Sequence, residues 1–139
     1  MLFGKPARTI RRVLIVEDEA LVAFDNEHML VEAGFTVVAT VDSVGRALRV
    51  IARQPLDLVL VDIMLSDQGS GFDVATAAHE RGIGVLFVSG FCPAEARALA
   101  LGCLAKPYHP RDLLAAIEAV EAHLAGGTVK RLPRGLSLY

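Results

Sequence analysis

The segment Val13-Leu14-Ile15-Val16-Glu17-Asp18-Glu19 places four consecutive apolar residues directly before three acidic ones. A short apolar run of this kind is consistent with a strand that is buried on both faces. Three later runs have the same form, and each ends on a different polar residue. They are residues 58–61 before Asp62, 85–88 before Ser89, and 103–105 before Lys106. If these are parallel strands of one sheet, the polar groups meet at one edge.

The segments between these runs have helical periodicity, so strands and helices alternate along the chain. The sequence predicts strands over about 12–16, 36–41, 56–61 and 83–88, with a short fifth strand before Lys106. Right-handed crossovers then give a flavodoxin-like (βα)5 fold, a doubly wound parallel sheet of strand order 2-1-3-4-5. Its ligand site is expected where the winding reverses, between the strands that carry Glu17, Asp18 and Asp62.

The predicted helices differ in the strength of their apolar faces. The first, which ends near Gly34, carries an apolar face of Val22, Met29, Leu30 and Ala33. The last, which follows Pro110, carries a face of Leu113, Ile117, Val120 and Leu124. The helix predicted over 93–101 is mostly alanine with few large anchors, so we expect it to be the most easily shifted element.

Composition limits the class of protein. With 139 residues, 53% hydrophobic and 22% charged, the chain has room for one globular domain. We expect an N-terminal arm over 1–10, the domain over 11–125, and a tail over 126–139 with no output domain. No apolar stretch reaches the roughly 18–20 residues of a membrane helix. A net charge of −2 gives no general attraction to nucleic acid. We therefore expect a cytoplasmic protein that binds neither membranes nor nucleic acid directly.

The two cysteines, Cys92 and Cys103, have no C-x-x-C spacing. Their pattern favours two unpaired thiols in a reducing cytoplasm.

The polar strand ends indicate phosphoryl chemistry beside a cation. Glu17, Asp18 and Asp62 are hard oxygen ligands that suit Mg²⁺, and three such charges would repel one another without a cation. Asp62 is the candidate nucleophile, because a carboxylate can accept a phosphoryl group as an acyl phosphate. Lys106 and Ser89 are suited to contact phosphoryl oxygens. A cis peptide before Pro107 would aim the lysine inward.

Glu17-Asp18, Asp62, Ser89 and Lys106-Pro107, in this order and at these intervals, resemble the receiver domain of two-component response regulators. The resemblance covers roughly residues 11–124. It implies that Asp62 accepts a phosphoryl group from a phosphohistidine of a sensor histidine kinase or a histidine phosphotransfer protein. It also implies Mg²⁺ bound by the acidic residues and the backbone carbonyl of Met64, with Ser89 and Lys106 on the phosphoryl oxygens.

For output, the resemblance implies a shift of Ser89 that repositions the fourth helix. A module without an output domain would then act through the surface of helix four, strand five and helix five, or pass the phosphoryl group on. We expect a signalling protein rather than an enzyme, and both a monomer and a homodimer stay open.

The chain departs from the family pattern at three places. Cys103 stands where receivers usually carry an aromatic switch residue. The stretch Phe87-Val88-Ser89-Gly90-Phe91 instead resembles a subset of stand-alone receivers with Phe-x-Thr/Ser-Gly-Tyr/Phe after strand four, in which Gly90 would free the loop. The loop after Asp62 has Ser66 in place of the usual proline and one extra residue before Gly71.

Met64 and Phe91 occupy positions that flank the phosphoryl group in receivers. Because both are apolar, neither can orient an attacking water, which predicts slow self-dephosphorylation.

Two other classes of function compete with a receiver. The alternative is a phosphorylation-independent, receiver-like interaction scaffold, which the missing aromatic favours and the intact acidic set opposes. A phosphatase with an aspartate nucleophile would carry Asp-x-Asp, whereas Ile63-Met64 follow Asp62. A metal or phosphodonor role is not expected for any of the scattered histidines, which are His28, His79, His109 and His123.

Overall fold

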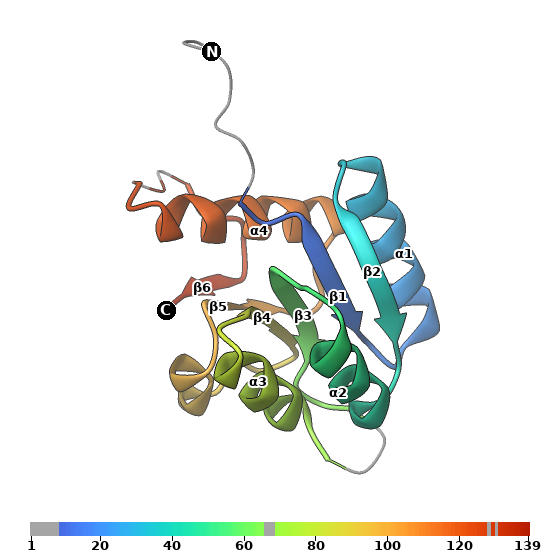
Figure 1. The fold of residues 1–139 in the computed structure, drawn as a ribbon. Helices are drawn as coiled ribbons and strands as arrows, with labels where there is room; N and C mark the ends of the chain where they lie inside the picture. Colours follow the sequence, from blue (N-terminus) through green and yellow to red (C-terminus); the bar gives the residue numbers. More distant parts are fainter. Residues whose placement is uncertain (1–8, 66–68, 128, 130) are drawn as a thin grey trace.

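The computed structural model describes residues 9–65, 69–127, 129 and 131–139, and Figure 1 shows its arrangement. In the sheet the strands lie in the order β2-β1-β3-β4-β5-β6. The first five are parallel, and β6 is antiparallel to β5. The strands are β1 (Arg12–Val16), β2 (Thr36–Val41), β3 (Leu58–Asp62), β4 (Gly84–Ser89), β5 (Gly102–Ala105) and β6 (Leu136–Leu138). The predicted flavodoxin-like order 2-1-3-4-5 is confirmed, with β6 as an addition.

Helices cover both faces of the sheet (Figure 1). They are α1 (Ala20–Glu32), α2 (Val44–Arg53), α3 (Gly71–Glu80) and α4 (Pro110–Leu124), with a 3-10 segment η1 (Ala94–Ala98) before β5. Alternate residues of β1 face opposite layers: Val13 and Ile15 pack with α1 and α4, whereas Leu14 and Val16 pack with α2 and α3. Both strand faces are therefore buried, which explains the unbroken apolar runs in the sequence.

Two faces of the predicted helices differ from expectation. In α1 the buried positions are Ala23, Asn26 and Leu30. Of the predicted face, Leu30 is buried, Ala33 packs against the core while partly exposed, and Val22 and Met29 are only partly buried. The buried face of this helix therefore mixes the small Ala23 and the polar Asn26 with the large Leu30. In α4, Leu113, Ile117 and Val120 are buried as predicted. Leu124 lies in the last turn, beyond the sheet, and is 55% exposed.

The helix predicted over residues 93–101 is wrong in type and length. Only Ala94–Ala98 forms a helix, and it is a 3-10 helix. Its only buried side chain is that of Ala96. Alanine buries little apolar area, so packing gives this segment little reason to complete regular α-helical turns.

The C-terminal residues extend the sheet. Leu136–Leu138 pairs with β5, after a turn in which Gly135 has φ of 85°. The strands approach so closely at Gly102 that a Cβ there would lie 2.7 Å from the carbonyl oxygen of Ser137. Of the tail's leucines, Leu136 is buried against the domain, whereas Leu132 is 41% exposed. The tail therefore docks on the domain that precedes it.

Parts of both termini and of the loop after β3 lie outside the residues that the structure describes. Most of the predicted arm over 1–10, and the departure noted at Ser66, lie outside the described residues. Within them, the backbone N–H groups of Thr9 and Ile10 donate to Glu121 of α4 at 2.7 Å each. Among the helices that the structure describes, none has the length and apolar character needed to cross a membrane.

Candidate functional site at the strand ends

The strand register brings the predicted polar residues to one edge. Val16 pairs with Val61, so Glu17 and Asp62 follow neighbouring positions of β1 and β3. Ser89 pairs with Ala105, and the backbone N–H of Lys106 donates to the Ser89 carbonyl at 2.7 Å. Parallel strands end on the same side, so four segments distant in sequence meet there.

Glu17, Asp18 and Asp62 form a compact acidic cluster. Each offers an oxygen, and these oxygens all lie within 4.8 Å of one another. Glu17 is 2% exposed and Asp62 is 5% exposed. Buried carboxylates at this separation need a cation nearby, since their mutual repulsion is weakly screened. The set matches the hard oxygen ligands that Mg²⁺ prefers.

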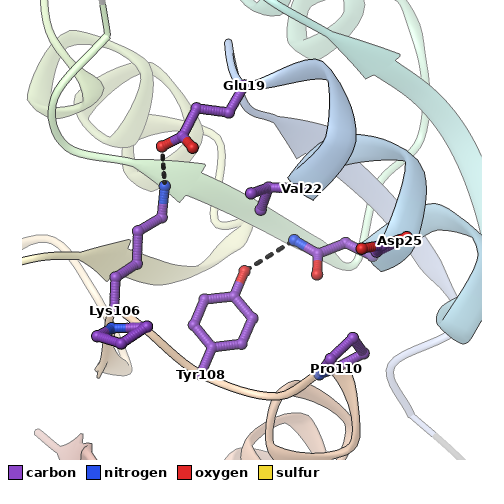
Figure 2. A pocket seen from close by; sticks show the side chains of 8 residues that line it. Glu19, Val22, Asp25, Lys106, Tyr108 and Pro110 are labelled. Atoms are coloured by element: carbon purple, nitrogen blue, oxygen red, sulfur yellow. Dashed lines mark hydrogen bonds and ion pairs between the residues drawn. The ribbon is translucent and has the colours of Figure 1, made fainter.

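Lys106 supplies positive charge to this cluster. Its Nζ lies 2.8 Å from Glu17 Oε1, 2.8 Å from Asp62 Oδ2 and 3.3 Å from Glu19 Oε1, the last contact being drawn in Figure 2. Burial alone would lower the pKa of Lys106, but the hydrogen bonds and charges of Asp62 and Glu17 outweigh it and raise that pKa. Burial raises the pKa of Glu17 despite the opposing ammonium. The peptide bond between Lys106 and Pro107 is cis.

Short backbone turns orient the acceptor groups. The N–H of Met64 donates to Asp62 Oδ1 at 3.0 Å, and the N–H of Phe91 donates to Ser89 Oγ at 3.3 Å. Ser89 is only 2% exposed. The Asp62 carboxylate is therefore held between a backbone donor on one oxygen and Lys106 on the other.

The two predicted flanking side chains lie at the rim. Met64 and Phe91 are each 75% exposed. Gly90 between Ser89 and Phe91 is also exposed, and an added Cβ there would meet nothing within 4 Å. His109, for which no ligand role is expected, caps α4 by accepting a hydrogen bond from the N–H of Arg111.

The prediction of two unpaired thiols is wrong. Cys92 and Cys103 form a disulfide with a Cα–Cα distance of 6.0 Å. Cys92 lies in the loop after β4, and Cys103 lies in β5. The sequence pattern missed the pair because the fold returns the chain beside β4 after 11 residues, a spacing that resembles no cysteine motif.

A groove beside the acidic cluster was not anticipated from the sequence. Its volume is about 380 Å³, and it runs between α1 and the segment after β5 (Figure 2). Within it, the side-chain amide of Asn26 donates to the Tyr108 hydroxyl at 2.8 Å, and burial raises the pKa of Tyr108. The lining residues are Glu19, Val22, Asp25, Asn26, Lys106, Pro107, Tyr108 and Pro110. A polar residue at a buried helix position, such as Asn26, is the signal that could have indicated it.

Together, the doubly wound sheet and the acidic pocket at its switch point define a flavodoxin-like α/β protein with a site suited to a cation. The family model of the response regulator receiver domain matches residues 13–118. The chain therefore belongs to the response regulator receiver family.

Relatives agree with this assignment. The chain is 34% identical over 114 residues to the transcriptional regulatory protein PdtaR of Mycobacterium tuberculosis, covering 78% of this chain and 55% of that protein. It is 33% identical over 79 residues to the TorCAD operon transcriptional regulatory protein TorR of Escherichia coli O157:H7, covering 56% of this chain and 34% of that protein. The chain thus spans about half of PdtaR and a third of TorR.

Solved structures show the same fold. A CheY-like receiver domain protein from Methanospirillum hungatei superposes with a TM-score of 0.72 at 28% identity, covering 86% of this chain and all of that one (100%). The response regulator PhyR from Brucella abortus gives a TM-score of 0.72 at 28% identity, covering 86% of this chain and 50% of that one.

Proposed function

We propose that this protein is a response regulator receiver that accepts a phosphoryl group on Asp62 from a phosphohistidine. The donor is a sensor histidine kinase or a histidine phosphotransfer protein. The observation that carries the proposal is the position of the Asp62 carboxylate, which lies 2.8 Å from Lys106 Nζ and clusters with Glu17 and Asp18.

In the proposed step an Asp62 carboxylate oxygen forms a bond to phosphorus while the phosphorus–nitrogen bond of the phosphohistidine breaks. The electron pair of that bond returns to the imidazole, which takes up a proton. The ammonium of Lys106 then exchanges its contact with the Asp62 carboxylate for one with a phosphoryl oxygen, which now carries the negative charge. The hydroxyl of Ser89 donates to another phosphoryl oxygen.

The acidic residues fit a bound Mg²⁺. Glu17, Asp18, Asp62 and the backbone carbonyl of Met64 would hold it, and it would supply charge neutralisation during transfer. Lys106 offsets only one of the three negative charges in the cluster. Glu17 and Asp18 therefore still need further positive charge nearby.

We place the protein in the cytoplasm as a signalling module rather than an enzyme, with no direct contact to nucleic acid or membrane. The receiver spans 11–125, and Leu136–Leu138 of the tail adds a strand to its sheet. A kinase or phosphotransfer helix would approach along α1, on which Leu21 and Phe24 are 73% and 65% exposed. Output goes through the η1–β5–α4 surface or by passing the phosphoryl group on.

The test is incubation with Mg²⁺ and a small phosphoryl donor, followed by intact-protein mass. We expect a gain of one phosphoryl group in the wild type and none in Asp62→Asn. Glu80→Gln is the matched control, because Glu80 is an exposed acid in the last turn of α3, at the opposite end of that helix from Asp62. A gain that survives in Asp62→Asn would contradict the assignment. No gain in any folded variant would favour the interaction scaffold.

The exposed Met64 and Phe91 predict a long-lived acyl phosphate. Met64→Asn with Phe91→Glu places groups that can orient water beside Asp62, so we expect the phosphoryl group to be lost about tenfold faster. The measurement is the decay of the phosphorylated mass after donor removal. Met64→Leu with Phe91→Leu keeps both positions apolar and should decay as the wild type does. An equal lifetime in the polar and apolar variants would contradict this explanation.

A further inference from the structure

The disulfide joins two segments that both carry groups of the site. Cys92 follows Ser89 by three residues, and Cys103 precedes Lys106 by three. In the sheet, Cys103 pairs with Phe87 of β4 on one side and with Ser137 of β6 on the other. One end of the covalent link is therefore fixed in the sheet interior, and the other lies in the loop after Ser89.

The segment between the two cysteines is held at its C-terminal end, where Leu99, Ala100 and Leu101 pack against the core, but its first part has few contacts. Its helix is five residues long and buries only Ala96. The guanidinium of Arg97 lies 5.2 Å from the centre of the Tyr139 ring, and both groups are near the surface. Phe91, the largest side chain of the loop, faces solvent and is 75% exposed. The link to Cys103 is accordingly a main tether of residues 90–98.

The two sulfurs differ in accessibility. Cys103 is fully buried at 0% exposure, whereas Cys92 is partly exposed. Exchange with an external thiol or disulfide proceeds first at the sulfur that can be reached. The chain has two cysteines in all, so intramolecular oxidation has a single product.

We propose that Cys92 and Cys103 are a reversible oxidation site that controls the freedom of the β4–η1 loop. In oxidation, the Cys92 thiolate attacks a low-molecular-weight disulfide and releases one thiolate, giving a mixed disulfide. The Cys103 thiolate then attacks the Cys92 sulfur and displaces the second thiolate. Two electrons pass from the cysteine pair to the small disulfide, which is reduced to two thiols. A dithiol reverses both steps.

The oxidised protein holds the loop against β5, and the reduced protein releases it. Because Ser89 lies at the start of this loop, the oxidation state also sets how readily its hydroxyl moves toward a group on Asp62. This second consequence rests on the proposed phosphorylation of Asp62, whereas the tether itself does not.

Hydrogen exchange of the full chain tests the tether. The protein is equilibrated in oxidised or reduced dithiothreitol, and intact mass with thiol alkylation reports the state of the pair. On reduction we expect amides over residues 90–98 to exchange about tenfold faster, with β1 and β3 unchanged. Cys92→Ser, at the partly exposed position, should exchange at the reduced rate in both buffers. Equal exchange in the two states would overturn the proposal, as would reduction that occurs only with loss of the circular dichroism signal.

Phosphorylation of the same two states tests the consequence at the site. With Mg²⁺ and a small phosphoryl donor, we expect the reduced protein and Cys92→Ser to gain the phosphoryl mass several-fold faster than the oxidised protein. If the two states are phosphorylated at equal rates while their hydrogen exchange differs, the coupling between the disulfide and Ser89 is overturned. The phosphorylation of Asp62 then still stands. Absence of phosphorylation in every state would overturn the proposed function and the coupling together, and the exchange result would still decide the tether.

Discussion

Replacing Lys106 with methionine is expected to destabilise the protein by about 2–4 kcal/mol at neutral pH without Mg²⁺. The ammonium lies 2.8 Å from both Glu17 and Asp62, which are almost fully buried. Methionine preserves much of the apolar stem but leaves these charges without their partner. Urea unfolding in a chelating buffer measures the loss.

The loss should depend on pH in a defined direction. Burial raises the pKa of Glu17 above its ordinary value of 4.5 in the folded protein. The folded state therefore holds this proton more tightly than the unfolded state, and stability falls as pH rises from about 4.5 through the folded pKa. Lys106 opposes this increase in the pKa of Glu17. In Lys106→Met the folded pKa of Glu17 is therefore higher, and stability keeps falling up to a higher pH.

Two comparisons make the prediction specific. Mg²⁺ should restore part of the stability of Lys106→Met, because it binds only the folded cluster. Arg46→Met removes an exposed ion pair with Asp42 and should change stability by less than about 0.5 kcal/mol. A loss in Lys106→Met that is no larger than this control, or that is the same at pH 5 and at pH 8, would contradict the role given to the lysine.

Gly71→Ala is expected to destabilise the protein by about 2–3 kcal/mol. A Cβ at Gly71 would lie 2.2 Å from the carbonyl oxygen of Asp62 and 2.7 Å from the Cα of Ile63. The N–H of Gly71 also donates to the Ile63 carbonyl at 2.9 Å. The start of α3 therefore presses on the backbone that carries Asp62, and the added methyl group must move one of them.

The matched control is Gly45→Ala in α2, where an added Cβ meets nothing within 4 Å. That change should stabilise the protein by up to about 1 kcal/mol, since alanine is the better helix former. Urea unfolding compares the two variants, and titration with Mg²⁺ should show weaker binding for Gly71→Ala. Equal stability of the two variants would show that α3 does not fix the position of Asp62.

The strands and the site were predictable because both depend on one strong signal. Strands buried on both faces carry continuous apolar runs, and in a parallel sheet the polar residue that ends each run then lies at a shared edge. Asp62 and Lys106 could therefore be placed near each other across 44 residues of sequence.

Other features could not be predicted from the sequence, because they depend on tertiary packing between segments rather than on a local sequence pattern. The 3-10 helix at Ala94–Ala98 has alanine-rich sequence but too little apolar area to complete an α-helix. The pairing of Cys92 with Cys103 depends on the return of the chain to β5. The strand β6 depends on the absence of a side chain at Gly102, where Ser137 approaches.

The measurement that tests the central claim most directly is the location of the phosphoryl group within the chain. Borohydride reduces an acyl phosphate to an alcohol, so protein treated with Mg²⁺ and donor, then reduced and digested, keeps a mark at the acceptor. We predict that this mark lies on the residue at position 62 alone and disappears when Mg²⁺ is chelated. A mark on another carboxylate, or phosphate retained on a histidine with position 62 unmodified, would contradict the account.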